Sequence, residues 1–240
     1  MVSKIIRAAV PAALVLLISA CSTFPTQGYN KAATGNPHSI ALAPMGLPER
    51  ANVRIMAPVG ANFGLIGAMV EAGRESTAMD EARVVLEKAN LNYQTYLPGQ
   101  IVKSLQSAGF EAQQLPGERD PKSRFKFMTG VSKEPGADAV LDIYTPFLGF
   151  IAAGATTDYR PSVLLDAKLV RASDQKVLFA DQIYYNNFQR VASPKAVSID
   201  PDPACVFKDR EELQADPQRT AACLQTAMDA AAKELAKQFL

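Results

Sequence analysis

Histidine is almost absent from this 240-residue chain, which contains only His38. A Ser-His-Asp or Cys-His arrangement needs a histidine that activates the nucleophile, and His38 lies in a predicted linker. The chain also lacks a GxSxG elbow, an HExxH helix and a phosphate-binding glycine loop. We therefore predict that the protein is not an enzyme, and we expect no cofactor and no metal site.

An excess of charge of one sign is also missing. The chain has 25 basic and 24 acidic side chains and a formal net charge of +1. Loss of residues 1–20 would remove Lys4 and Arg7 and no acid, which leaves 23 basic and 24 acidic side chains, a net of −1. Nucleic-acid binding demands a strongly basic face, so we expect no nucleic-acid partner.

The longest apolar stretch at the N-terminus is short. Residues 8–17 are almost purely apolar but contain Pro11, and a membrane-spanning helix needs about 20 such residues. Lys4 and Arg7 precede the stretch, and small residues follow it. A basic start, a short apolar core and small residues at the cut are typical of a secretory signal. The alternative is an ordinary buried helix.

The segment Leu17-Ile18-Ser19-Ala20-Cys21 resembles the lipobox of bacterial lipoproteins. In that family the cysteine is acylated, with palmitate among its chains, and becomes the mature N-terminus. Several acyl chains give permanent anchoring, whereas one is marginal. Ser22, in place of the aspartate that retains such proteins at the inner membrane, implies the outer membrane and its periplasmic face. The resemblance divides the chain into a signal peptide (1–20), a lipidated cysteine with a flexible tether (21–51) and one domain (52–240).

Two cysteines remain beyond the predicted lipid site. The periplasm is oxidising, and an even pair in such a compartment indicates a disulfide more often than a metal site. A bond between Cys205 and Cys223 would close a loop of roughly 20 residues and stabilise the protein by about 3 kcal/mol. The alternative is two buried free thiols.

Hydrophobic periodicity predicts an α+β domain. We expect strands where apolar residues alternate, and helices where they recur every three or four positions. The predicted strands are residues 53–57, 110–115, 139–144, 163–170 and 177–183; the predicted helices are 77–90, 98–108 and 217–239. The last two strands are joined by a short polar turn and form an antiparallel hairpin. The expected fold is a mixed, mainly antiparallel sheet with two or three helices packed on one face.

This order of elements resembles the N-terminal domain of TolB and the periplasmic domain of the curli secretion lipoprotein CsgG. The resemblance covers most of the domain, but only as element order. It implies a periplasmic α+β domain, and no binding residue is carried over from it.

Two glycine-rich apolar segments follow predicted strands. One contains Phe63, Leu65 and Ile66, and the other contains Phe147, Phe150 and Ile151. If the preceding strands run parallel, both segments emerge at the same end of the sheet and form one exposed apolar lip. Such a patch marks a contact with a protein or a membrane. The alternative is that both segments fold back into the core.

Three aspartates lie in neighbouring predicted strands. One interpretation of Asp142, Asp166 and Asp181 is a carboxylate cluster for acid–base chemistry or for a cation. The alternative is that they mark the solvent side of the sheet, with Lys168 as a partner.

These features favour a membrane-anchored envelope lipoprotein with a non-catalytic assembly or accessory role, exercised through contacts with a protein partner or with further copies of itself. The alternative is a periplasmic binding module that captures a lipid or peptidoglycan fragment in a pocket between sheet and helices.

Overall fold

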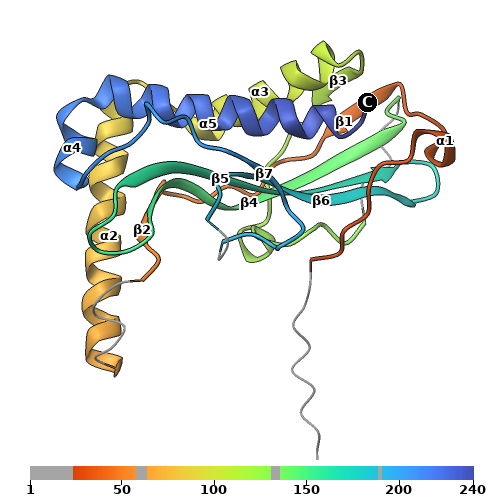
Figure 1. The fold of residues 1–240 in the computed structure, drawn as a ribbon. Coiled ribbons are helices and arrows are strands. Elements are labelled where there is room, and N and C mark those ends of the chain that lie inside the picture. The colour runs from red at the N-terminus through yellow and green to blue at the C-terminus, as the bar shows by residue number, and fades with distance from the viewer. Residues whose placement is uncertain (1–23, 58–63, 131–135, 189–190) are drawn as a thin grey trace, which may run out of the picture.

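One mixed β-sheet with helices on one of its faces forms the body of the protein (Figure 1). The computed structural model describes residues 24–57, 64–130, 136–188 and 191–240. Its strands are β1 (Ser39–Leu42), β2 (Asn52–Ile55), β3 (Glu111–Gln114), β4 (Ala139–Ala152), β5 (Tyr159–Arg171), β6 (Val177–Tyr185) and β7 (Val197–Ile199). Its helices are α1 (Lys31–Thr34), α2 (Gly64–Lys88), α3 (Tyr93–Ser107), α4 (Arg210–Ala215) and α5 (Pro217–Lys237), with a 3-10 turn at Pro121–Ser123. The predicted α+β class is confirmed.

The long strand β4 organises the sheet, whose order is β3-β1-β4-β5-β6-β7. The three longest strands pair antiparallel, β4 with β5 and β5 with β6, so the predicted hairpin is confirmed. β1 and β2 both run parallel to β4, β1 beside its first half and β2 beside its last four residues. The sheet is therefore mixed, with its longest ladders antiparallel.

The ordered domain begins well before residue 52, so the predicted tether 21–51 is too long. β1 lies between β3 and β4, and Ile40 and Leu42 are buried. Four residues are too few to display a period, which is why the sequence did not reveal this strand. Earlier still, the Gln27 N–H donates to the Ala180 carbonyl at 2.7 Å and the Ala180 N–H donates back at 2.9 Å.

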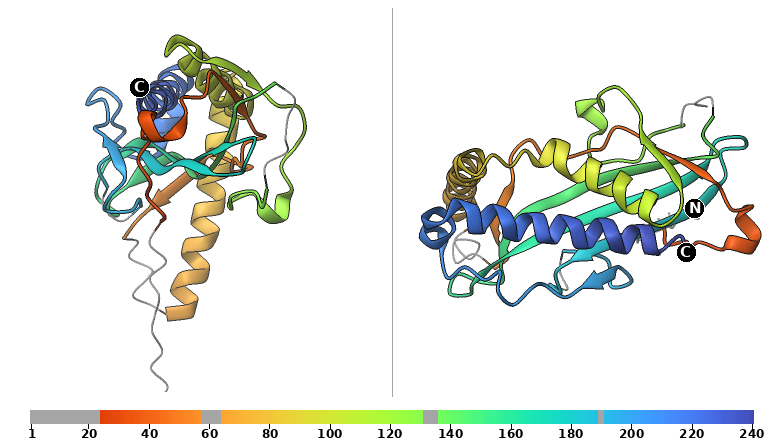
Figure 2. Two further views of the ribbon diagram at one scale, coloured as in Figure 1. Left: turned by 90° about the vertical axis from the view of Figure 1, so that its right-hand side faces the viewer. Right: turned by 90° about the horizontal axis from the view of Figure 1, so that it is seen from above.

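Helices α3 and α5 lie side by side over one face of the sheet (Figure 2). α5 begins as predicted, with the Asp216 side chain accepting a hydrogen bond from the Arg219 N–H at 3.0 Å. α3 begins five residues before its predicted start at Pro98, because Asn92 caps it by accepting from the Gln94 N–H. Both helices bury an apolar stripe against the sheet, formed by Leu97, Ile101, Leu105, Leu224, Met228, Ala231 and Leu235.

Helix α2 is longer than predicted and only half of it packs on the body. The predicted cap Thr77 lies inside the helix, where its hydroxyl donates to the Gly73 carbonyl at 3.0 Å. Glycines at 64, 67 and 73 weaken helix propensity, so residues before 77 did not look helical. Ala78, Ala82 and Leu86 enter the core, whereas the N-terminal half extends past the sheet on the side opposite α3 and α5 (Figures 1 and 2).

A disulfide joins Cys205 to Cys223, with 18 residues of sequence separation and 5.4 Å between the two Cα atoms. Cys205 lies in the long connection after β7, and Cys223 lies on the buried side of α5. Arg219 reinforces the same junction: its guanidinium donates to the Val206 carbonyl at 2.8 Å and stacks over the Phe207 ring at 4.5 Å. The bond therefore ties α4 and the preceding loop to α5.

Replacement of both Cys205 and Cys223 by Ser should lower the free energy of unfolding by about 3 kcal/mol, because the open chain regains the entropy of a loop of this length. Denaturant unfolding measures the change. The wild-type protein should lose the same stability when a reductant is added, and the double variant should be indifferent to it. Equal stability of oxidised and reduced wild-type protein would contradict the role given to the bond.

Candidate interaction site

Three residues of the predicted apolar lip are buried in strand β4, so the prediction is wrong for them. β4 continues to Ala152, eight residues past its predicted end, and the exposed fractions of Phe147, Phe150 and Ile151 are 6%, 0% and 2%. Phe150 faces the main core, while Phe147 and Ile151 belong to a separate apolar cluster. Alternation along a strand sends neighbours to opposite faces, so the three cannot share one surface.

The other half of the predicted lip is described only in part. Phe63 lies outside the described residues, and Leu65 and Ile66 are placed in the first turn of α2 without a description of their side chains.

A close approach of two strands explains the glycine in the second segment. Gly149 has φ +151°, and a Cβ atom there would lie 1.9 Å from the Asn52 carbonyl oxygen. The Asn52 side chain also accepts from the Leu148 N–H at 3.0 Å. β2 and β4 run parallel at this point, which is the condition set for the apolar lip, so the chain leaves both strands at the same end of the sheet.

The exposed apolar surface lies instead on the part of α2 that extends beyond the sheet, which we call the α2 arm (residues 68–77). Met69 is 68% exposed and Val70 is 49% exposed. Ion pairs accompany them: Glu71 with Arg74 at 3.1 Å within the helix, and Glu75 with Arg54 of β2 at 2.7 Å. Met69 and Val70 belong to the apolar segment noticed in the sequence, but only the length of the helix places them in solvent.

A groove of about 400 Å³ separates the α2 arm from the sheet and the β4–β5 turn. We call it the α2 groove; it is lined by Val53, Ile55, Glu71, Arg74, Glu75, Ala78, Ala155, Tyr159 and Arg210. Its apolar lining comes from the strands and the turn, and its charges of both signs come from α2 and α4. An apolar centre with a polar rim is the usual composition of a protein-binding surface.

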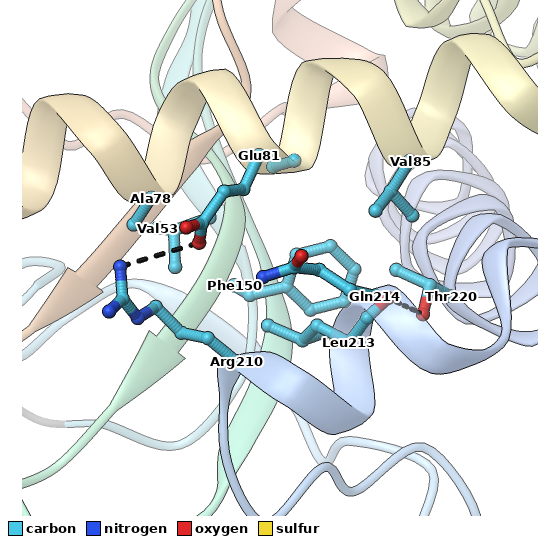
Figure 3. A pocket seen from close by; sticks show the side chains of 10 residues that line it. Val53, Ala78, Glu81, Val85, Phe150, Arg210, Leu213, Gln214 and Thr220 are labelled. Atoms are coloured by element: carbon cyan, nitrogen blue, oxygen red, sulfur yellow. Dashed lines mark hydrogen bonds and ion pairs between the residues drawn. The ribbon is translucent and has the colours of Figure 1, made fainter.

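A smaller hollow continues from this groove between α2, α4 and the sheet (Figure 3). It offers about 10 Å³ to the centre of a water molecule, which is close to the room that one water needs. Three of its polar residues are already paired: Arg210 with Glu81 at 3.3 Å, and the Thr220 hydroxyl with the Leu213 carbonyl at 2.8 Å. The hollow has no room for a lipid or a peptidoglycan fragment.

The three aspartates do not converge, and they do not mark a solvent side. Asp142, Asp166 and Asp181 are 0%, 4% and 8% exposed. By strand register Asp142 and Asp166 lie on the face opposite α3 and α5, whereas Asp181 lies opposite Ala167, a residue of the main core. Within the described ranges, no three His, Cys, Asp or Glu side chains lie together as metal ligands would.

Asp142 holds a loop on the sheet face opposite α3 and α5, which we call the helix-free face. We call residues 117–130 the clasp loop. The guanidinium of Arg119 donates to the Asp142 carboxylate at 2.8 Å, and the side chains of the pair are 4% and 0% exposed. The Met128 N–H donates to the other carboxylate oxygen at 2.7 Å, and Lys168, the predicted partner, lies 3.9 Å from it. Burial lowers the pKa of Lys168.

Arg119 also binds the backbone on both sides of the loop. Its guanidinium donates to the Pro44 and Ile143 carbonyls at 3.1 Å each, and to the Lys126 carbonyl within the loop. The Phe127 ring packs edge-on against Tyr144 with centroids 4.9 Å apart. These contacts make the clasp loop a fixed cover of the sheet. They could not be predicted from the sequence, because the loop is polar and shows no hydrophobic period.

No protein-family model matches the chain, and no curated protein matches it. Solved structures with similar folds include a DUF330 protein from Xanthomonas campestris (13% identity, 89% of this chain, 84% of that chain, TM-score 0.43). Another is a PelC dodecamer from Paraburkholderia phytofirmans (10% identity, 85% of this chain, 96% of that chain, TM-score 0.35). A third is lipoprotein GNA1162 from Neisseria meningitidis (14% identity, 62% of this chain, 82% of that chain, TM-score 0.30). These TM-scores carry no functional argument, and the likeness to TolB and CsgG stays a prediction.

No described helix combines the length and the apolar character needed to cross a membrane. Residues 1–20 and Cys21, where the signal and the lipid site are predicted, lie outside the described residues.

Replacement of Arg119 by Met should lower the free energy of unfolding by about 3–5 kcal/mol, because it leaves a buried carboxylate without its partner. The Arg119→Met, Asp142→Asn double variant should be more stable than the single one, since the unpaired charge is gone. Arg83→Met, which breaks the exposed Arg83–Glu87 pair, is the control and should cost at most about 0.5 kcal/mol. Denaturant unfolding distinguishes them; similar losses in the two single variants would contradict the clasp.

Replacement of Asp166 by Asn should help stability more at pH 7 than at pH 4. Burial raises the pKa of Asp166, and hydrogen bonds with Tyr144 and Gln182 offset part of the effect. The native state therefore holds this proton more tightly than the unfolded state, so wild-type stability falls as pH rises from near 4 through the native pKa, by about 1.4 kcal/mol per unit of pKa difference. The Asp166→Asn variant has no carboxyl at this position, so its free energy of unfolding should not show this decrease with pH.

Asp174→Asn is the matched control for this pH series. The Lys176 N–H and Arg171 lower the pKa of the exposed Asp174 carboxyl, so its contribution is present at neutral pH and is lost on acidification. The relative stability of this variant should fall as pH rises, opposite to Asp166→Asn. Denaturant unfolding measures both, from pH 4 to 7 for Asp166→Asn and below about pH 4 for Asp174→Asn, because the lowered pKa of Asp174 places its change there. The same trend in both would refute the assignment.

Proposed function

We propose that the protein is an exported lipoprotein, anchored through Cys21 to the periplasmic face of the outer membrane, with a non-catalytic assembly or accessory role. The anchor rests on the lipobox and the charged, apolar start of the chain. The disulfide Cys205–Cys223 agrees with an oxidising compartment. The role rests on the protein's surface, where the α2 groove offers both charges and apolar contacts beside the exposed Met69 and Val70.

The α2 groove carries this proposal. Its rim charges, Arg74 among them, stand on a helix that leaves the body, while its inner wall is made by strand residues of the core. A partner segment in the groove would cover apolar atoms of Val53 and Ile55 and meet charges of both signs. Such a surface selects a partner whose charged side chains lie opposite charges of the other sign, rather than one that fills a single deep pocket.

A periplasmic binding module remains the second candidate, and it also depends on the α2 groove. The groove's volume of about 400 Å³ lies within the range of small-molecule sites, whereas the hollow under it holds about one water. A peptidoglycan fragment would therefore bind in the open groove and not between sheet and helices, as the sequence suggested.

Replacement of Ala155 by Trp should block the α2 groove. Ala155 is an exposed residue of the β4–β5 turn at the groove, so the larger side chain fills the space without entering the core. We expect at least about a tenfold loss of the protein adducts recovered after mild crosslinking in intact cells, because a central contact contributes more than 1.4 kcal/mol. Intact-mass analysis of the same preparations checks acylation of Cys21.

Ala222→Trp is the control, since Ala222 is an exposed alanine of α5 that does not line the groove. If both variants keep the same adducts, the groove is not the contact. If the adducts persist but Ala155→Trp abolishes binding of a soluble muropeptide measured by calorimetry, the binding-module candidate takes the place of the assembly role.

A further inference from the structure

The chain enters the domain on the helix-free side of the sheet, opposite α3 and α5. Phe24, the first described residue, packs against Phe127 of the clasp loop with ring centroids 5.9 Å apart. Phe127 in turn lies on Tyr144, whose side chain points away from α3 and α5. From Gln27 the chain passes β6 and reaches the helix side, where the Tyr29 ring lies 5.7 Å from that of Phe239. The start of the domain is thus held against the helix-free side.

This docking leaves little slack between the domain and the predicted lipid. Three residue steps separate Cys21 from Phe24, and fully extended they span at most about 11 Å. The sequence suggested a free tether of several nanometres, but the described part of that tether lies on the body. A lipid on Cys21 would therefore keep the helix-free side close to the bilayer and turn α3 and α5 away from it.

The α2 arm extends on this same side, away from α3 and α5 (Figures 1 and 2). Its ten residues are about 15 Å long at 1.5 Å per residue. That length matches the link of about 11 Å plus a few ångströms of headgroup layer. The arm is therefore long enough for its end, where Met69 and Val70 lie, to reach a membrane surface held at the distance of the link.

Three of the exposed large apolar side chains of the described residues lie on this side: Met69, Val70 and Phe125. Of the other two, Val84 lies on the half of α2 that packs on the body, and Leu240 follows α5. Phe125, 44% exposed, belongs to the clasp loop and is flanked by the exposed Lys122 and Lys126. Apolar tips beside lysines suit the boundary between acyl chains and headgroups, where lysine keeps its charge in water and attracts anionic lipid.

The acidic side chains near the arm do not oppose such a contact. Glu71 is paired with Arg74, and Glu75 is paired with Arg54. The patch therefore presents apolar atoms and neutralised pairs to the surface. The clasp loop adds the exposed Lys122 and Lys126 beside Phe125, and the exposed acids Glu118 and Asp120 precede them in the chain.

We propose that the helix-free side of the domain rests on the phospholipid bilayer, with Met69 and Val70 of the α2 arm and Phe125 of the clasp loop entering the headgroup region. This inference rests on the proposed lipid anchor at Cys21. It gives the protein a fixed orientation, in which α2 is a second, apolar contact and the α2 groove opens beside the membrane surface.

The chain contains no tryptophan, so a single introduced tryptophan reports on one position. Met69→Trp and Phe125→Trp are tested in the lipidated full chain, reconstituted into vesicles of phosphatidylethanolamine and phosphatidylglycerol with brominated acyl chains. Leu240→Trp is the control, because Leu240 is 67% exposed at the end that follows α5. Bromine quenches tryptophan only at short range, and interfacial side chains reach about 5–10 Å into the headgroup boundary.

We expect at least about threefold stronger quenching in the Met69→Trp and Phe125→Trp variants than in Leu240→Trp, with blue-shifted emission. Quenching as weak as that of the control overturns the membrane contact. A blue shift without quenching, together with a larger particle in detergent, overturns it in favour of contact between copies. Intact mass is recorded first: an unacylated Cys21 refutes the anchor, whereas an acylated protein with unquenched tryptophans refutes the orientation alone.

Discussion

The buried ion pair between Arg119 and Asp142 determines how the helix-free side of this protein is built. Both charges are out of water, and a buried pair of this kind persists only where further hydrogen bonds satisfy its remaining atoms. Here those bonds run to backbone groups on either side, so the pair joins the clasp loop, the connection after β1 and the strand β4. Phe127 is held by this loop, and Phe24 is held by Phe127. The place where the chain enters the domain therefore depends on one guanidinium.

That constraint links the fold to the proposed role. A domain on a long free tether would sample many orientations above a membrane, whereas a domain docked three residues from the proposed lipid site would have few. α3 and α5 bury their stripes on the far face of the sheet, and α2 alone crosses to the near side (Figure 1). The α2 groove lies where the arm meets the sheet. A partner in the groove would meet a surface whose height and direction above the bilayer are set by covalent and buried contacts.

The sequence predicted the elements whose residues carry a clear period. The stripe of α5 and the β5–β6 hairpin are confirmed by the structure. The misses have common physical causes. β1 is too short to show alternation, the glycines of α2 hid its first half, and β4 was ended early because Gly149 resembled a loop residue. That glycine serves a close strand contact instead. Phe150 of the predicted apolar lip lies in the core, and the exposed apolar side chains of this region are Met69 and Val70.

Local order along the chain was enough to predict the class of fold, the start of α5 and the pairing of Cys205 with Cys223; the lipid site at Cys21 stays a prediction. These depend on periodicity, on caps and on spacing, which act over a few residues. Tertiary structure alone decided that Asp142 is a buried partner of Arg119, that the start of the domain lies on the helix-free side and that half of α2 stands in solvent. Such outcomes depend on which surfaces stay exposed after the helices have packed on the sheet. That depends on contacts between distant parts of the chain, which no short stretch of sequence specifies.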